Sequence, residues 1–415
     1  MSPGHPLPAP ALVIDGDGRA ALAVVRSLGR RGIPVTVSAA TARSLAGASR
    51  HASHRLALPD PAAEPDRLAD ALAALAAREP GSVWFPVTDT SLAVVDAARA
   101  RLAQVHLPIA GSEALALAWD KGRLIELADS LGVATPKTWM PESPGAVRAL
   151  ARELKYPVVI KPRRSRWRTP SGFVTGRVMY AHSPEALASV WETMHSQIPA
   201  PLIQERVPGF GMGLFVLADQ GKVLVRFAHR RLREKPPSGG VSVLSESIRV
   251  PPELEASADR LVAALTWRGV CMIEFKVDAR DGRPLLMEMN PRLWGSLELA
   301  IASGVDFPWF LYRQALGQPL EPQPSYRLGV RSRWVLGDLD HLLIRLRGGD
   351  RNLVPGAPSR LGALLAFLNP FAGRPEVFQP GDPGPGWHEL RSYVKALMGG
   401  PDEGSERELH PRYRP

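Results

Sequence analysis

Residues 272–292 read MIEFKVDARDGRPLLMEMNPR. Two apolar segments flank the turn-forming letters ARDGRP, so this stretch predicts a β-hairpin. Each predicted strand carries an acid in an apolar setting, Glu274 in the first and Glu288 in the second. Because ionised side chains are rarely buried without a partner, we expect a positively charged group close to both acids.

The connection between the two strands decides whether these acids meet. Alternate residues of a strand share a face, so an odd-length or bulged turn places Glu274 opposite Glu288. A two-residue Asp-Gly turn instead sends them to opposite faces. Opposed carboxylates, with the oxygen of Asn290 on the same face, form a donor set that suits Mg²⁺. A salt-bridge network with Lys276 and Arg292 is the alternative, and spacing alone leaves both open.

A lysine at the end of a second apolar strand precedes a glycine-bearing loop. The segment 158–178, VVIKPRRSRWRTPSGFVTGRV, contains Lys161, Gly172 and Gly176. Backbone amides of such a loop, with a lysine behind them, can cradle a polyphosphate, whereas a solvated basic loop is the plainer interpretation. Only eight of the 51 basic residues are lysine, which gives each lysine more weight.

The first third of the chain alternates strand and helix signals, as in a parallel sheet covered by helices that ends near residue 115. The predicted strands are 11–15, 34–38, 83–87 and 105–109, and the predicted helices start at Arg19, near 65 and near 91. Asp120 is placed to cap a helix from Lys121 to Leu131. Beyond residue 156, strands with glycine-bearing loops and helices near 184–195 and 252–266 predict an α+β region.

The pattern weakens after about Ser325, and 326–415 is interpreted as a C-terminal extension of uncertain fold. Its apolar segment LGALLAFLNPFAG, 361–373, is shorter than the roughly 18 residues of a membrane-spanning helix. Between a helix on a membrane surface and a core helix, we favour the core helix.

The composition of the chain limits its possible partners and its cellular location. A net charge of +10 favours anionic partners, or simply reflects an arginine-rich chain. The single cysteine, Cys271, cannot form an internal disulfide, and the N-terminal residues do not resemble a signal peptide. We therefore expect a cytoplasmic protein without a transmembrane segment.

Gly16, Gly18 and Ala21 form the pattern G-x-G-x-x-A between a strand and a helix. Dinucleotide-binding turns share this pattern, but they also need an acid after the second strand to hold a ribose. The segment PVTVSAAT lacks that acid, so NAD binding is disfavoured.

Six pieces in order resemble the ATP-grasp superfamily, and most closely its carboxylate-amine ligase-like members. They are DK (120–121), IKP (160–162), the glycine loop, QERVPG (204–209), IEF (273–275) and MEMNPR (287–292). The resemblance implies an α/β, Rossmann-like pre-ATP-grasp domain at 8–115 and an α+β ATP-grasp domain at 116–325, with subdomains of about 116–200 and 201–325. It favours the metal interpretation of the hairpin.

The resemblance also implies a role for each matching residue. Lys121 and Lys161 would reach the nucleotide phosphates, and the loop from Gly172 to Gly176 would close over them. The adenine would contact Gln204, Glu205 and Val207. One or two Mg²⁺ (or Mn²⁺) ions would be held by Glu274, Glu288 and Asn290.

The chain departs from the family in two places. Met212 stands where several relatives have a ribose-binding acid, and Met272 stands where some peptide-forming relatives have an arginine. Arg292, or an arginine of the 230–233 cluster such as Arg231, would then stabilise the transferred phosphoryl group. Trp294 and Ser296, just beyond, are candidates for an acceptor pocket or for ordinary packing.

The function implied is an ATP- and Mg²⁺-dependent ligase that activates a carboxylate as an acyl phosphate and transfers it to an amine or similar nucleophile. Its partners would be the small-molecule carboxylate and amine, with no specific nucleic acid and an open oligomeric state. One alternative is a bicarbonate-phosphorylating enzyme like biotin carboxylase or carbamoyl phosphate synthase. Another is a basic, non-catalytic protein that binds nucleotides, nucleic acid or a membrane.

Overall fold

The computed structural model describes residues 8–321, 323, 325–348, 353 and 357–398. The chain forms two compact units, each built from segments that are distant in sequence. The first comprises Met1–Ile109, Phe227–Arg249 and Arg292–Pro415, and the second comprises Ala110–Arg226 and Val250–Pro291. None of the described helices combines the length and the apolar composition needed to cross a bilayer.

The first unit contains the predicted parallel sheet. Its strands, in the order β3-β2-β1-β4, are β1 (Ala11–Ile14), β2 (Val35–Ala39), β3 (His54–Ala57) and β4 (Val83–Pro86). All neighbours in this sheet run parallel, which confirms the prediction for this region. The predicted strand at 105–109 is wrong. Only His106 forms a bridge, to Val83, and Pro108 has no N–H to continue the ladder.

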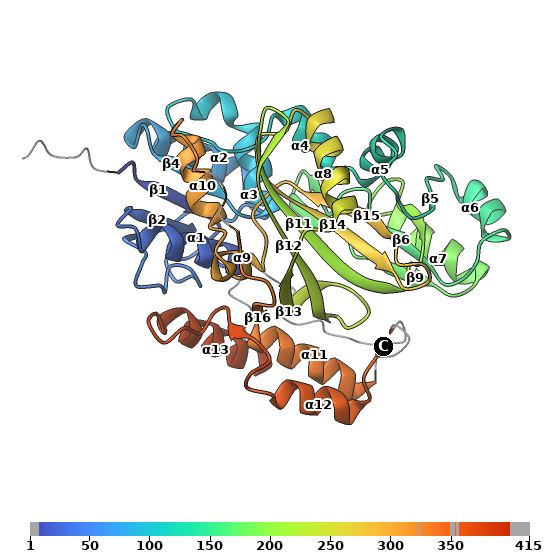
Figure 1. Ribbon diagram of the computed structural model, residues 1–415. Coiled ribbons are helices and arrows are strands. Elements are labelled where there is room, and N and C mark those ends of the chain that lie inside the picture. The colour runs from blue at the N-terminus through green and yellow to red at the C-terminus, as the bar shows by residue number, and fades with distance from the viewer. Residues whose placement is uncertain (1–7, 322, 324, 349–352, 354–356, 399–415) are drawn as a thin grey trace, which may run out of the picture. The chain divides into compact units, whose positions relative to one another are not determined.

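Helices pack against this sheet, as Figure 1 shows for α1 in blue. They are α1 (Arg19–Gly29), α2 (Pro65–Arg78), α3 (Asp89–Ala97) and the short 3₁₀ helix η1 (Arg99–Leu102). The glycine pattern before α1 has a packing role. A Cβ on Gly16 would lie 2.4 Å from Val37 Cγ1, so the turn needs glycine to approach β2.

The described part of the C-terminal extension belongs to the first unit. The unit's remaining elements are β13 (Val241–Ile248), α9 (Leu297–Ser303), α10 (Phe307–Ala315), β16 (Arg331–Arg333), α11 (Val335–Arg347), α12 (Arg360–Leu368), β17 (Arg374–Pro375) and α13 (Gly384–Leu397). Strand β16 pairs with β13 and with β17. Buried ion pairs join Arg19 to Glu376 and Arg26 to Asp382, so the extension is held by polar groups of α1.

The predicted core helix within 361–373 is wrong in one respect. Residues 360–368 do form helix α12, but Leu361, Leu365 and Leu368 are each more than 60% exposed, and only Ala363 is buried. The apolar composition of this helix therefore does not serve a core.

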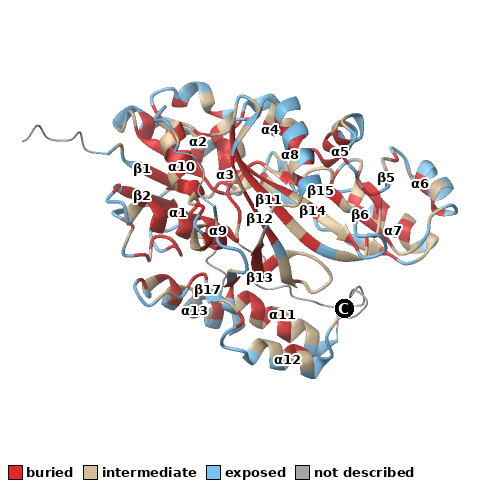
Figure 2. Cartoon of the chain, viewed as in Figure 1, coloured by how far each residue is buried: buried red, intermediate tan, exposed pale blue. Residues whose placement is uncertain are grey.

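The second unit holds a four-stranded antiparallel sheet in the order β5-β10-β6-β9. Its strands are β5 (Thr138–Trp139), β6 (Val158–Lys161), β9 (Met179–Ala181) and β10 (Leu202–Glu205). Apolar residues of these strands share one core with α6 (Pro144–Ala151) and α7 (Pro184–His195), centred on the fully buried Trp191. The burial is visible in the red segments of Figure 2.

The same unit carries the long strands of the opening motif. These are β11 (Gly209–Asp219), β14 (Gly269–Asp278) and β15 (Pro284–Asn290), with β14 between the other two. Its other elements are α4 (Ser112–Trp119), α5 (Lys121–Ser130), the hairpin of β7 (Arg166–Thr169) and β8 (Gly172–Thr175), and α8 (Pro252–Ala264). Strand β12 (Lys222–Lys235) begins in this unit and continues into the first. The chain has the mixed α and β content that the sequence predicts.

Candidate functional site

The two acids of the opening stretch lie opposite each other. In the antiparallel pair β14–β15, Glu274 faces Glu288 and Met272 faces Asn290. This confirms the predicted register. The structural cause of this alignment differs from the predicted one. The strand pairing slips by one residue after Glu274, so that Met287 is the extra residue of a β-bulge. The bulge therefore lies in β15 and not in the connecting turn.

The turn itself has four residues, 279–282. Asp278 N–H donates to the carbonyl oxygen of Arg283 at 2.9 Å, and Gly282 adopts a positive φ of 77°. An even-numbered loop alone would place Glu274 opposite Met287. The bulge at Met287 restores the alignment of the two carboxylates. The position of Glu288 opposite Glu274 therefore depends on the bulge.

Helix α5 presents Lys121 to this hairpin. Asp120 caps the helix, as predicted, by accepting from the N–H groups of Gly122 and Arg123. At the first helical position, Lys121 places its Nζ 3.2 Å from Glu288 Oε2 and donates to Ser165 Oγ at 2.8 Å. The positively charged partner expected from the sequence is thus present.

Lys161 lies at the end of β6, where Nζ donates to Gln204 Oε1 at 2.8 Å. The antiparallel pairing of β6 with β10 brings the two residues together. Gln204 is itself buried and donates through Nε2 to Thr138 Oγ1 at 2.9 Å. Burial, with some help from the nearby Lys121 charge, lowers the pKa of Lys161 to about 8, although Glu288 opposes the shift.

Glu288 is ionised at neutral pH. Burial opposes its ionisation, but the Lys121 ammonium, a hydrogen bond from Asn290 Nδ2 at 3.0 Å and the Lys161 ammonium outweigh burial and lower its pKa to about 2. Glu274, Glu288 and Asn290 supply hard oxygen atoms on one strand face, and they leave coordination positions for phosphate or water. This donor chemistry fits Mg²⁺. Among the described residues, no three His, Cys, Asp or Glu side chains form a metal-binding group, and this set contains two acids.

The predicted glycine loop is a β-hairpin formed by β7 and β8. Gly172 has a φ of 116°, a conformation that favours glycine at this turn. A Cβ on Gly176 would lie 2.5 Å from Pro162 Cγ and 2.8 Å from Ile198 Cδ1. The second glycine therefore allows the hairpin to approach the residue that follows Lys161.

The predicted adenine contacts follow β10. Glu205 N–H donates to the Lys137 carbonyl oxygen at 2.9 Å, and Lys137 N–H donates to Glu205 Oε1 at 3.1 Å. Val207 is buried. The segment is thus held against the chain that leads into β5.

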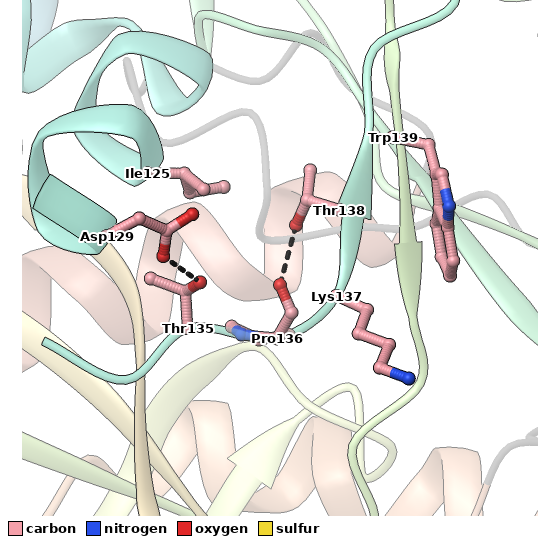
Figure 3. Close-up of a pocket in the computed structure, with 7 residues that line it drawn as sticks. All are labelled: Ile125, Asp129, Thr135, Pro136, Lys137, Thr138 and Trp139. Atoms are coloured by element: carbon pink, nitrogen blue, oxygen red, sulfur yellow. Dashed lines mark hydrogen bonds between the residues drawn. The ribbon is translucent and has the colours of Figure 1, made fainter. Parts of the chain in front are cut away.

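An open cavity of about 350 Å³ lies beside this segment (Figure 3). It is lined by Ile125, Asp129, Thr135, Pro136, Lys137, Thr138 and Trp139. None of the predicted site residues lines it. Thr138 connects it to the site, because this hydroxyl donates to the Pro136 carbonyl oxygen and accepts from Gln204. Sequence reasoning missed Thr138, which carries no motif.

The two predicted catalytic arginines lie in the first unit, and both are engaged there. Arg292 Nε is 3.0 Å from Asp89 Oδ2 at the start of α3. Arg231 is only 7% exposed, pairs with Glu234 at 3.0 Å and donates to the Gly240 carbonyl oxygen at 2.9 Å. Their catalytic roles stay predictions.

The acceptor-pocket candidates are buried. Trp294 packs edge-on against Phe307, and Ser296 Oγ lies 3.5 Å from His229 Nδ1. Burial holds the pKa of His229 well below its usual value. Packing accounts for Trp294, while the His229 contact was not foreseen because it joins residues 67 positions apart.

A second polar group lies at the carboxyl ends of β1 and β4, beside the loops near residues 16–19 and 88–90 that the sequence indicates as parts of an acceptor pocket; Asp15 itself was not predicted. Thr88 Oγ1 donates to Asp15 Oδ2 at 2.6 Å, and Asp15 is buried with a φ of 74°. Strained backbone at the carboxyl end of parallel strands is typical of ligand sites. In the sequence, the glycines of the Gly-Asp-Gly segment that follows Asp15 were the feature that indicated an unusual turn here.

Comparisons with known proteins show which proteins this chain resembles. A family model described as "ATP-grasp in the biosynthetic pathway with Ter operon" matches residues 197–337. The carbamoyl phosphate synthase large chain of Xylella fastidiosa is 25% identical over 303 residues, covering 68% of this chain and 27% of that protein. The chain spans about a fifth to a quarter of the length of the curated relatives it matches.

Solved structures show the same fold. The biotin carboxylase domain of Hydrogenobacter thermophilus 2-oxoglutarate carboxylase, in complex with MgADP and bicarbonate, has a TM-score of 0.61 at 17% identity and covers 79% of this chain and 74% of its own. The L-amino acid ligase of Bacillus licheniformis has a TM-score of 0.57 at 18% identity and covers 75% of each chain. Together with the ordered motifs, these findings show that the chain has the fold of ATP-grasp proteins and resembles the carboxylate-amine ligase-like members of that superfamily.

Proposed function

We propose that the protein is an ATP- and Mg²⁺-dependent ligase that activates a carboxylate as an acyl phosphate and transfers the acyl group to an amine. The observation that carries the proposal is the ion pair of Lys121 with Glu288, with the charge of Lys161 nearby and Glu274 directly across the hairpin. Two ammonium groups next to opposed carboxylates make a site for polyphosphate with a divalent cation.

Each side chain of this site has a separate task. Lys121 and Lys161 would neutralise phosphate oxygens; Lys121 pairs with Glu288, and Lys161 donates to Gln204 and lies near enough to Glu288 for that charge to raise its pKa. Glu274, Glu288 and Asn290 would hold Mg²⁺, and the charge of that ion would offset the charge on the phosphates. The protein mainly positions reactants, and this explains why no nucleophilic side chain is needed.

The remaining roles follow the resemblance. The β7–β8 hairpin, with Gly172 and Gly176, covers the phosphates, and adenine binds along Gln204, Glu205 and Val207. Arg292 neutralises the transferred group, and Arg231 does so only if it leaves Glu234.

The proposed layout is a pre-ATP-grasp domain at 8–115, an ATP-grasp domain at 116–325 and an extension at 326–415. The small-molecule carboxylate and amine are the partners, and the cytoplasm is the proposed location.

Bicarbonate as the activated acid is the second candidate. The observation that favours it is the likeness to carbamoyl phosphate synthase and to a biotin carboxylase domain crystallised with bicarbonate. The likeness to an L-amino acid ligase favours an organic carboxylate and an amine. The two candidates share the phosphate site and differ in the acid.

The test is ADP release from Mg-ATP by the purified full chain, across panels of carboxylates and amines with bicarbonate as a separate arm. Mass spectrometry then identifies the product. We expect release that requires both an acid and an amine and that is lost in Glu288→Gln. Asp281→Asn, in the exposed turn of the same hairpin, is the matched control and should keep full activity. Release with bicarbonate alone would select the second candidate, and equal activity of both variants would contradict the assigned site.

A further inference from the structure

Helix α12 carries its apolar stripe on the outside. Leu361, Leu365 and Leu368 are spaced to share one helix face, and their exposed fractions are 64%, 61% and 62%. Phe371, just past the helix, is 91% exposed. A contiguous exposed patch of large apolar side chains marks an interaction surface.

Helix α13 and the segment before it also expose large apolar side chains. Trp387, Val394 and Leu397 are 54%, 42% and 58% exposed. Phe378 packs edge-on against Trp387, with ring centroids 6.1 Å apart, and remains 46% exposed. Tryptophan and phenylalanine in such positions are typical of surfaces that meet a bilayer interface.

Charge is segregated across the same region. Within the described residues of 331–398, the acids Asp338, Asp340, Glu376 and Asp382 are buried, and Glu389 accepts a hydrogen bond from Trp334 Nε1. The exposed charged residues of these helices and their connections are Arg347, Arg360, Arg374 and Arg391. The acids of this region are buried or hydrogen-bonded and the exposed charged side chains are arginines, so the exposed charge of this region is basic.

We propose that this surface, formed by α12, α13 and residues 371 and 378, docks the protein onto an anionic lipid membrane. The leucines and aromatic rings would enter the headgroup region, and the arginines would pair with lipid phosphates. Neither helix is long enough to span a bilayer, so both lie along its surface.

Other occupants fit less well. A second copy of this chain would bring arginines against arginines in a two-fold interface. Nucleic acid would use the arginines but leave the leucines and phenylalanines exposed to water. Of these three occupants, the anionic lipid surface matches both the apolar and the basic parts.

The test is co-sedimentation of the full chain with vesicles of phosphatidylcholine alone, and with vesicles of phosphatidylcholine and phosphatidylglycerol in equal amounts. We expect binding to the anionic vesicles that weakens with salt. Arg360→Gln should lower the partition constant about fivefold. The double variant Leu361→Ser/Leu365→Ser should lower it at least about tenfold.

The controls are Leu328→Ser, at a 51% exposed leucine outside these helices, and Arg78→Gln on α2. Both should bind as the unaltered protein does. Circular dichroism checks the fold, and ADP release should be unchanged in every variant, which separates this proposal from the catalytic one. Absence of binding to anionic vesicles would overturn the proposal. So would a dimer in light scattering that Leu361→Ser/Leu365→Ser dissociates while no variant binds lipid.

Discussion

Replacing Glu288 with glutamine tests how charge is balanced in the phosphate site. Glutamine keeps the size of the side chain and can still accept from Asn290, but it removes the charge that faces Lys121 at 3.2 Å. The Glu288 side chain is 29% exposed and that of Lys121 is 10% exposed, so solvent screens this pair only partly.

The pKa of Glu288 gives the magnitude. A fall from 4.5 to about 2 corresponds to roughly 3 kcal/mol of stabilisation at neutral pH. Because the folded state favours the ionised form, this stabilisation is present above the unfolded pKa and is lost as the pH falls from 4.5 toward 2. Glu288→Gln should therefore lower the free energy of unfolding by roughly 3 kcal/mol at neutral pH, and by less in acid.

The assay is urea unfolding followed by tryptophan fluorescence, at neutral pH and at about pH 3. The control Asp281→Asn removes an exposed pair with Arg283 and should change stability little. In the absence of Mg²⁺, ADP should stabilise Glu288→Gln at least as strongly as the unaltered protein, because phosphate replaces the lost partner of Lys121. Equal stability of the variant and the unaltered protein at neutral pH would refute the reasoning.

Three further predictions test other parts of the molecule. Since the pKa of Lys161 is about 8, the affinity for ADP should fall as the pH rises through that value, and Lys161→Met should abolish this dependence in calorimetric titrations. Gly176→Val should displace the β7–β8 hairpin from Pro162 and raise the dissociation constant for ADP about tenfold, measured by the same titrations. Arg26→Ala leaves the buried Asp382 carboxylate with hydrogen bonds from Ser49 and Arg50 but without the charge of Arg26, and should cost about 3 to 5 kcal/mol in urea unfolding, with faster proteolysis of the C-terminal segment.

The hairpin shows how far sequence reasoning reaches. The alternation of apolar and acidic letters leaves the placement of Glu274 and Glu288 to the turn, the resemblance to metal-binding relatives predicts that they face each other, and the structure agrees. The sequence does not reveal that the extra residue is Met287, because a bulge and an odd-length turn produce the same pattern. The helix that begins at Lys121 could also be predicted from the sequence, because capping by Asp120 depends on residues that are adjacent in the chain.

The arginines and helix α12 show where such reasoning fails. Arg231 is one of several similar arginines in its strand, and only the fold shows that Glu234 and Gly240 engage it. The leucines of α12 have the spacing of a core face. Whether that face meets a core or solvent depends on what packs against it, which local sequence does not encode.

From the amino-acid order alone one obtains the parallel sheet, most helices, the opposed acids and the family resemblance, because each rests on periodicity, on neighbours along the chain or on the order of the motifs. Only the tertiary structure places the C-terminal extension in the first unit, through contacts such as Arg26 with Asp382, 356 residues apart. The local sequence shows that a charged side chain needs a partner. The tertiary structure decides which of the many oppositely charged side chains becomes that partner. For the same reason the exposed, basic surface of α12 and α13 is a property of the folded protein.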